Sequence, residues 1–228
     1  MDRRLARLVG GGAAAILALA GAARAEEAKH AEGEKKGGCA HCDKEKAKAA
    51  EKKAPTQGDA RVTLVDRVLL DQDGKKVRFV KDVVGSDVVA VDFVFTHCTT
   101  ICPVLSAKMV RLQQLLGDRL GKGVKLVTMS LDPARDTPER MKACGAKFKA
   151  GPHWHFLTGA PEDQEEVLKG LGAWVANIYE HPPMILVGNG KTGRWVRVNG
   201  FPDPKKVVEL VDELQGVKKP ATAQAGGR

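Results

Sequence analysis

The feature that most constrains this chain is a long apolar run that ends beside a pair of cysteines. Residues Val88–Phe95 form a nearly continuous stretch of β-branched and aromatic side chains, which is typical of a central strand buried on both faces. Cys98 and Cys102 follow it, and apolar residues then recur at helical spacing over Leu105–Leu116. The sequence therefore predicts a buried strand, a short loop that carries two thiols, and a helix that begins near Cys102.

Strands and helices alternate along the rest of the chain. A strand-like run over Val62–Leu70, a turn over Asp71–Gly74 and a second run over Lys76–Val80 indicate a β-hairpin ahead of the central strand. After the cysteines, the patterns predict strands at 123–130, 154–157, 184–187 and 194–198, and helices at 137–150, 161–171 and 203–214. This order, with two cysteines at a strand-to-helix junction, predicts an α/β, thioredoxin-like fold in which helices flank a central mixed β-sheet, with an N-terminal β-hairpin.

The N-terminus carries the pattern of a secretory signal peptide, over residues 1–25. Arginines precede an apolar run over Leu8–Ala22, and small residues then lead to a predicted cleavage site after Ala25. The alternative is an uncleaved membrane anchor, although a span needs about 20 apolar residues and this run is shorter. We therefore expect a periplasmic or otherwise exported protein, which would be membrane-anchored if the signal were retained.

The 228 residues suffice for one packed domain with extensions. Residues 26–57 are rich in Lys, Glu and Ala without apolar periodicity, so they are predicted to form a flexible arm. Residues 58–216 hold the predicted thioredoxin-like domain, and 217–228 are expected to be a disordered tail. No second hydrophobic span follows the signal and nothing indicates an obligate dimer, so we expect a monomer with no stable membrane span after signal cleavage.

The arm contains a small cluster of metal-ligating residue types. Cys39 and Cys42 stand three positions apart with His41 between them, which makes a compact set of soft ligands for copper(I) or zinc. The alternative is an adventitious disulfide, because no second cysteine pair is present to complete a zinc site. The three residues are a candidate auxiliary metal site.

The formal net charge of +9 does not indicate nucleic-acid binding. The signal segment holds four arginines against one aspartate, so its removal leaves a charge of +6. Much of the remainder lies in lysine-rich flanks, where charge usually serves solvation. The sequence has no basic stripe with interleaved aromatic residues and no nucleic-acid-reading motif, so we expect no nucleic-acid partner.

The position of the cysteine pair has a direct chemical consequence. Unpaired backbone N–H groups and the helix dipole at the predicted helix start would stabilise a thiolate on Cys98 or Cys102. A thiolate is both the nucleophile of disulfide exchange and a ligand for soft metals, so the pair alone leaves both functions open. A third ligand would favour a metal, and the candidate is His181, just ahead of the strand predicted at 184–187.

Three blocks of the sequence carry a family resemblance. Residues 93–103, which include both cysteines, closely resemble the signature of the Sco/SenC family of copper-handling thioredoxin-like proteins. Residues 129–139 and 156–159 resemble that family's second and third signatures, and His181 stands at the spacing of its metal-binding histidine. The similarity extends over Val62–Leu214.

The resemblance implies a periplasmic copper chaperone, or a thiol reductase, that serves assembly of the binuclear copper centre of cytochrome c oxidase. Copper, as Cu⁺ or Cu²⁺, would be held by Cys98, Cys102 and His181. The expected partner is an oxidase subunit or another copper chaperone, and the protein would be a carrier and not an enzyme. A thiol-disulfide oxidoreductase, which would not need His181, is the alternative, and a peroxidase on the same fold is a third.

The sequence departs from the family pattern at two places. Thr99 and Thr100 separate the cysteines where the family commonly has Pro-Asp, so the redox potential and copper affinity are expected to differ. Pro182 and Pro183 follow the histidine, and a cis peptide is predicted at His181–Pro182 or Pro182–Pro183, because X-Pro bonds reach cis at low cost.

Several nearby polar residues have structural interpretations. Cys144 is predicted to be a small buried residue of a helix, and His97 to shape the cysteine loop. Asp132, Arg135 and Asp136 follow the second core strand, where they are expected to form an ion pair that braces the site, with partner recognition as the alternative.

Overall fold

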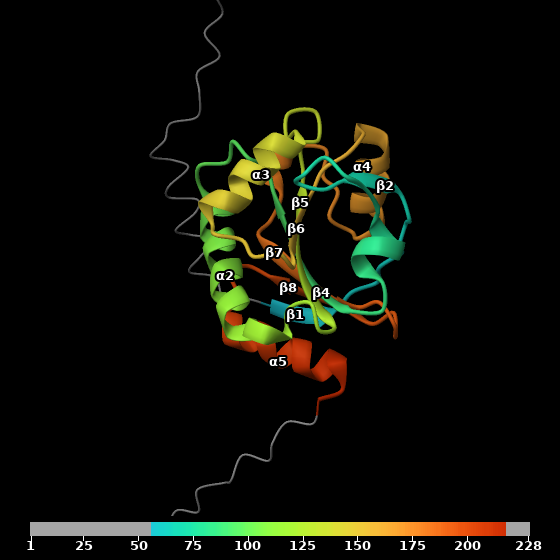
Figure 1. Cartoon of the computed structure of the whole chain (residues 1–228), viewed down its shortest axis with the longest axis vertical. Helices are drawn as coiled ribbons and strands as arrows, with labels where there is room; N and C mark the ends of the chain where they lie inside the picture. The colour runs from blue at the N-terminus through green and yellow to red at the C-terminus, as the bar shows by residue number, and fades with distance from the viewer. Residues whose placement is uncertain (1–55, 218–228) are drawn as a thin grey trace, which may run out of the picture. The chain divides into compact units, whose positions relative to one another are not determined.

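The centre of the molecule is a mixed β-sheet. The computed structural model describes residues 56–217, and within this range six strands form one sheet in the order β1-β8-β7-β4-β5-β6 (Figure 1). The strands are β1 Thr56–Asp59, β4 Val88–Val94, β5 Val124–Ser130, β6 Trp154–Leu157, β7 Met184–Asn189 and β8 Trp195–Asn199. The neighbours from β4 to β6 run parallel, whereas β7, β8 and β1 join antiparallel. The predicted mixed sheet is confirmed.

Strand β4 lies between β5 and β7, and all seven of its residues are buried. Val91 faces Val127 on one neighbouring strand and Leu186 on the other. Successive side chains point to opposite faces of a sheet, so the continuous apolar run over Val88–Val94 serves two cores at once. This burial confirms the prediction of a central strand.

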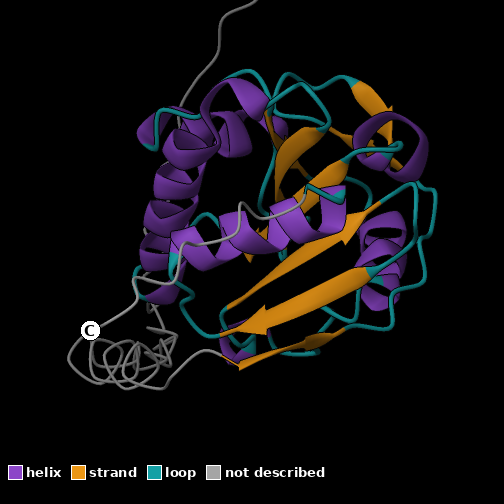
Figure 2. Ribbon diagram, turned by 90° about the horizontal axis from the view of Figure 1, so that it is seen from below, coloured by secondary structure: helices purple, strands orange, loops and turns teal. Residues whose placement is uncertain are grey.

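Helices cover both faces of the sheet. The helices α2 Ile101–Leu116, α3 Pro138–Lys147 and α5 Pro204–Gln215 contribute to one core, and Figure 2 shows α5 lying across the strands. The opposite face is covered by α4 Pro161–Gly170, by a π-helical segment at Phe79–Val84 and by the hairpin. Short 3₁₀ turns occupy Gly117–Arg119 and Ile178–Glu180. No helix within residues 56–217 is long and apolar enough to cross a membrane.

The helix starts that the sequence predicted are confirmed to within a residue or two. At α3, the Thr137 side chain accepts a hydrogen bond from the Arg140 backbone N–H, and Pro138 follows at the first position. At α5, the Asp203 side chain accepts from the Lys205 backbone N–H. These caps supply partners for N–H groups that would otherwise be unpaired at a helix start.

The predicted hairpin is present but shorter than expected. Its strands are β2 Val68–Leu70 and β3 Lys76–Arg78, which pair antiparallel. The turn is held by Asp71, whose Oδ1 accepts backbone hydrogen bonds from Asp73 and Lys75, both at 2.9 Å. The preceding residues do not pair as a strand, because the backbone N–H of Thr63 donates to the Gly170 carbonyl of α4 at 2.9 Å.

The folded domain begins two residues earlier than the sequence predicts. Thr56 and Gln57, which the sequence places in the arm, begin strand β1, which pairs with β8. All four residues of β1 are exposed, so backbone pairing and not an apolar pattern makes this strand, and hydropathy could not reveal it. The signal peptide, the rest of the arm and residues 218–228 lie outside the described residues.

Candidate thiol and metal site

The cysteine loop leaves the end of β4 and is tied to the loop after β5. The carboxylate of Asp136, which is fully buried, accepts hydrogen bonds from the Thr96 backbone N–H at 3.1 Å and the Thr96 hydroxyl at 2.6 Å. The hydroxyl of Ser130 donates to the same carboxylate at 2.7 Å. The loop is therefore braced by a hydrogen-bonded carboxylate, where an ion pair was expected. Arg135 lies 3.7 Å from Asp132, so an ion pair is present beside this brace.

Cys98 lies in a setting that stabilises its thiolate. The backbone N–H of Cys102 donates to the Cys98 Sγ at 3.4 Å, and the Thr100 hydroxyl lies 3.8 Å from the same sulfur. The hydrogen bond from the Cys102 side chain, with these weaker contacts, lowers the pKa of Cys98 to about 5 against the opposing effect of burial. This half-buried side chain is therefore mostly thiolate at neutral pH.

Cys102 has the opposite character. It occupies the first turn of α2 and is only 7% exposed. Its hydrogen bond to Cys98, followed by burial and by the negative charge of Cys98, raises the pKa of Cys102 well above its usual range. The pair thus consists of one half-buried thiolate and one buried thiol. The sequence predicted that the helix start would stabilise a thiolate on one of the two cysteines, and in the structure that cysteine is Cys98.

His181 lies just ahead of β7, the strand that pairs with β4 in the sheet. It follows the 3₁₀ turn Ile178–Glu180, is 5% exposed, and its ring centroid lies 5.6 Å from that of Phe93. Burial lowers the pKa of His181 to about 4, with a hydrogen bond to the Ala173 backbone acting in the other direction. Its Nε2 is buried and has no hydrogen-bond partner among the described residues. A neutral imidazole with a free nitrogen can accept a metal ion.

A small cavity lies between the histidine and Cys102. Its volume is about 10 Å³, and Cys102 and His181 both line it, together with Phe93, Leu105 and Pro183. That volume is on the order of one water-sized sphere, which is enough for a single ion. No three His, Cys, Asp or Glu side chains within residues 56–217 converge as a metal site.

The prediction of a cis peptide after His181 is wrong. Both bonds, His181–Pro182 and Pro182–Pro183, are trans, like every peptide bond of the described residues. His181 has an extended backbone at φ −61° and ψ 122°, which leads directly into β7 without a tight turn. The Pro183 carbonyl accepts a hydrogen bond from the Gly200 backbone N–H at 2.7 Å. Without a turn that demands cis, the trans preference of an X-Pro bond prevails.

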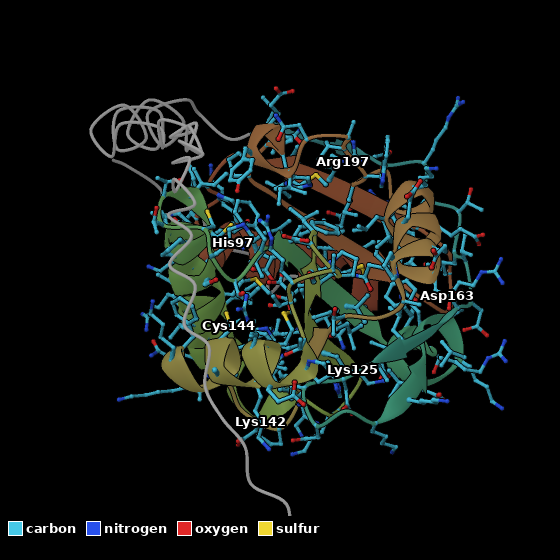
Figure 3. All side chains as sticks on the ribbon, turned by 90° about the horizontal axis from the view of Figure 1, so that it is seen from above. His97, Lys125, Lys142, Cys144, Asp163 and Arg197 are labelled. Atoms are coloured by element: carbon cyan, nitrogen blue, oxygen red, sulfur yellow. The ribbon has the colours of Figure 1, made fainter. Side chains whose placement is uncertain are left out.

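Cys144 is only partly what the sequence predicted. It packs against the core on the α3 side, but it is half-buried and lines a pocket that Cys98 and Cys102 also line. Burial raises the pKa of Cys144 to about 11, so it stays a thiol. Figure 3 shows Cys144 and Lys142 on opposite sides of α3, with the cysteine toward the molecule's interior.

Sequence reasoning missed two residues near the site. Tyr179, the single tyrosine of the chain, lies two positions before His181, and its Oη is 3.3 Å from the His97 Nε2. Asp92 is fully buried in β4, where it accepts a hydrogen bond from Thr128, and burial raises its pKa to about 7. The one signal for Asp92 was a charged residue within an otherwise apolar run.

The cysteine loop, the mixed sheet and the covering helices define a thioredoxin-like protein with a CxxxC pair and a distal histidine. A family model described as SCO1/SenC matches residues 58–184, which is more than half of the chain. The chain therefore belongs to the SCO1/SenC family. The SCO1 protein homolog of Bacillus subtilis is 36% identical over 108 residues, a stretch that covers 46% of this chain and 54% of that relative. The chain thus spans about half the length of this relative.

Solved structures share the fold over almost their whole length. A SCO1/SenC family lipoprotein from Bacillus anthracis has a TM-score of 0.59 at 26% identity, covering 69% of this chain and 97% of that one. BsSco, a member of the Sco family of cytochrome c oxidase assembly proteins with a disulfide switch, has a TM-score of 0.59 at 26% identity. The match covers 72% of this chain and 99% of BsSco. Copper-bound ScoI of Arabidopsis thaliana has a TM-score of 0.57 at 24% identity, and the match covers 69% of this chain and 99% of that one. These likenesses confirm the predicted fold.

Proposed function

We propose that this protein is an exported copper chaperone that binds copper through Cys98, Cys102 and His181. The observation that carries the proposal is the buried Nε2 of His181, which has no hydrogen-bond partner among the described residues and lines a cavity with Cys102. A buried polar atom without a partner costs free energy. A ligand that occupies this nitrogen would remove that cost.

The donor set suits copper. Two cysteine sulfurs and a neutral imidazole combine soft and intermediate ligands, which copper(I) prefers and hard cations such as magnesium do not. Cys98 is already ionised and His181 already neutral, so two of the three donors are in their binding form at neutral pH. Only the Cys102 thiol has to lose a proton.

The open arrangement suits a carrier. The three donors are not preassembled among the described residues, so their side chains have to move together for binding, and the reverse movement would release the ion to a partner by ligand exchange. Cys98 is half-buried, so one ligand is within reach of an incoming protein while Cys102 and His181 stay covered. We propose that the recipient is a cuproprotein, the binuclear copper centre of cytochrome c oxidase, reached directly or through another chaperone.

The relatives support this assignment at the level of chemistry. The Arabidopsis structure holds copper, and BsSco belongs to a family of cytochrome c oxidase assembly proteins. We propose the same class of cargo and destination for this chain, with the protein acting as a monomer. The signal-like residues 1–25 support export, and the Bacillus anthracis relative is a lipoprotein.

The arm cluster remains a separate proposal. Cys39, His41 and Cys42 would form an auxiliary site that captures metal and passes it to the main site. The test is a variant that lacks residues 26–55, which leaves β1 intact. A lower copper stoichiometry is expected, and an unchanged stoichiometry would rule the auxiliary site out.

A thiol-disulfide oxidoreductase is the second candidate. The observation that favours it is the contrast between an accessible Cys98 thiolate and a buried Cys102 thiol, which is the arrangement of an attacking and a resolving cysteine. The disulfide switch of BsSco is in line with such chemistry. This function requires both cysteines and does not use His181.

An anaerobic copper(I) titration of the reduced, signal-free protein against a competing chelator separates the two candidates. His181→Ala is compared with His155→Ala, which removes a half-buried histidine from β6, away from the cavity. The chaperone proposal expects tight binding that is lost in His181→Ala and kept in His155→Ala. Weak copper binding that is the same in the parent protein and in His181→Ala would favour the oxidoreductase.

A further inference from the structure

A larger pocket opens on the side of the cysteine loop that faces α3. Its volume is about 370 Å³, within the range of small-molecule sites, and its lining includes Cys98, Pro103, Arg140, Cys144 and Lys147. His181 belongs to the other, smaller cavity and is not part of this lining. The half-buried Cys98 side chain therefore adjoins a space that the proposed copper site does not account for.

One face of α3 supplies the charged wall of this pocket. Arg140, Cys144 and Lys147 follow each other at spacings of four and three residues, which places them on one side of the helix. The thiol of Cys144 therefore lies between a guanidinium and an ammonium group. Phe95 and Phe148 add apolar surface to the lining.

Among residues 56–217, neither the Arg140 nor the Lys147 side chain forms an ion pair. The Lys147 ammonium lies 5.8 Å from the Phe148 ring centroid. No Asp or Glu is among the residues that line the pocket. Lys142 on the same helix differs, because its ammonium lies 2.9 Å from an Asp73 carboxylate. The pocket thus combines unneutralised positive charge with an adjacent nucleophile.

We infer that this pocket binds a small disulfide that carries carboxylate groups, and that Cys98 exchanges with it. The carboxylates would pair with Arg140 and Lys147, and the apolar part of the ligand would contact Phe148. This positions a ligand sulfur at the Cys98 end of the pocket. A small molecule is favoured over a protein surface because the site is concave and of limited volume.

The exchange balances without a metal ion. The Cys98 thiolate attacks one sulfur of the small disulfide, the ligand S–S bond breaks, and one ligand half leaves as a thiolate. The Cys102 sulfur then loses its proton to the second ligand half and attacks the Cys98 sulfur, which breaks the mixed disulfide. The pair gives up two electrons and becomes a disulfide, and the ligand is reduced to one thiolate and one thiol. This step goes beyond the proposed copper function and does not use His181.

The test measures reaction of the reduced, signal-free protein with three probe disulfides at low salt. Oxidised glutathione is anionic, bis(2-hydroxyethyl) disulfide is neutral and cystamine is cationic. The rate of mixed-disulfide formation is followed by mass spectrometry after acid quenching. The double variant Arg140→Gln/Lys147→Gln is compared with Lys142→Gln, which removes a charge from the same helix outside the pocket.

The inference expects the ratio of the oxidised glutathione rate to the neutral-disulfide rate to fall by about tenfold in the double variant. The ratio should stay within about twofold of the parent in Lys142→Gln, and salt should reduce the parent ratio. An unchanged ratio in the double variant, or an equal fall in both variants, would overturn the inference. Copper affinity measured on the same samples is expected to be retained, so loss of anion selectivity is distinguishable from loss of the copper site or of the fold.

Discussion

The hydroxyl of Tyr179 lies 3.3 Å from the Nε2 of His97, and this contact joins the loop that carries the cysteines to the loop that carries His181. The ring of Phe95 packs against both residues, with centroid distances of 4.8 Å to His97 and 5.4 Å to Tyr179. Tyr179 is 68% exposed, so its ring is not held by burial. His97, predicted to shape the cysteine loop, therefore connects the two halves of the proposed copper site.

Removal of this contact is expected to weaken copper binding. Tyr179→Phe deletes the hydroxyl and keeps the ring, so the copper dissociation constant should rise by about threefold to tenfold, the usual range for one hydrogen bond. Tyr179→Ala should have a larger effect because it also removes the ring contacts. Chelator competition measures both, with Trp174→Phe, an exposed aromatic outside these contacts, as the control. Equal affinities for Tyr179→Phe and the parent protein would exclude a role for the hydroxyl.

Alkylation should be selective for Cys98, because its pKa is lowered while the pKa values of Cys102 and Cys144 are raised. Because its pKa is about 5, Cys98 should react with iodoacetamide at a rate that rises through pH 5 and is nearly constant from pH 6 to 8. Cys102 and Cys144 should react far more slowly in this range, since their pKa values are raised. Peptide mass spectrometry identifies the modified residue. A Cys98 rate that still increases steeply between pH 7 and 8 would contradict the proposed thiolate.

Copper binding should release about one proton at pH 7. Cys98 is ionised and His181 is neutral, so Cys102 is the one ligand that must lose a proton. Isothermal titration calorimetry in buffers with different ionisation enthalpies measures the number released. Release of about two protons would mean that Cys98 is protonated in the free protein. Release of none would mean that Cys102 does not bind copper as a thiolate.

The buried carboxyl of Asp92 should make stability fall with pH. Burial raises its pKa from 3.8 to about 7, so the folded protein holds a proton that the unfolded chain releases between these values. The stabilising effect is present below about pH 4 and is lost as pH rises through 7. The parent should lose roughly 1–3 kcal/mol of unfolding free energy from this group between pH 5 and 8.

Asp92→Asn should remove that slope, because the amide has no proton to lose. Its carbonyl oxygen can still accept the hydrogen bond that Thr128 donates at 2.5 Å. Urea unfolding at several pH values measures the effect, and Asp118→Asn, at an exposed position, is the control. If the parent and Asp92→Asn show parallel pH profiles, the carboxyl is ionised throughout.

Local sequence patterns determined the core of the fold. The apolar run at Val88–Val94 and the helical period after Cys102 define their elements because burial on a sheet or a helix face imposes a fixed spacing. Strand β1 and the shortening of the hairpin could not be predicted in the same way, because both depend on segments remote in the sequence. Thr56 pairs with Asn199, and the backbone N–H of Thr63 donates to the Gly170 carbonyl.

Residue types and their positions also identified the candidate ligands Cys98, Cys102 and His181. Two thiols at a strand-to-helix junction indicate disulfide exchange or metal binding, and a histidine ahead of a core strand is a candidate third ligand. Tertiary structure decided how these groups behave. Burial makes His181 neutral and leaves its Nε2 without a partner, and the contact between two thiols makes one acidic and keeps the other protonated. The cationic wall formed by α3 beside Cys98 likewise depends on packing between separate elements. Charge and solvation are set by all neighbours in space, so only the folded chain determines them.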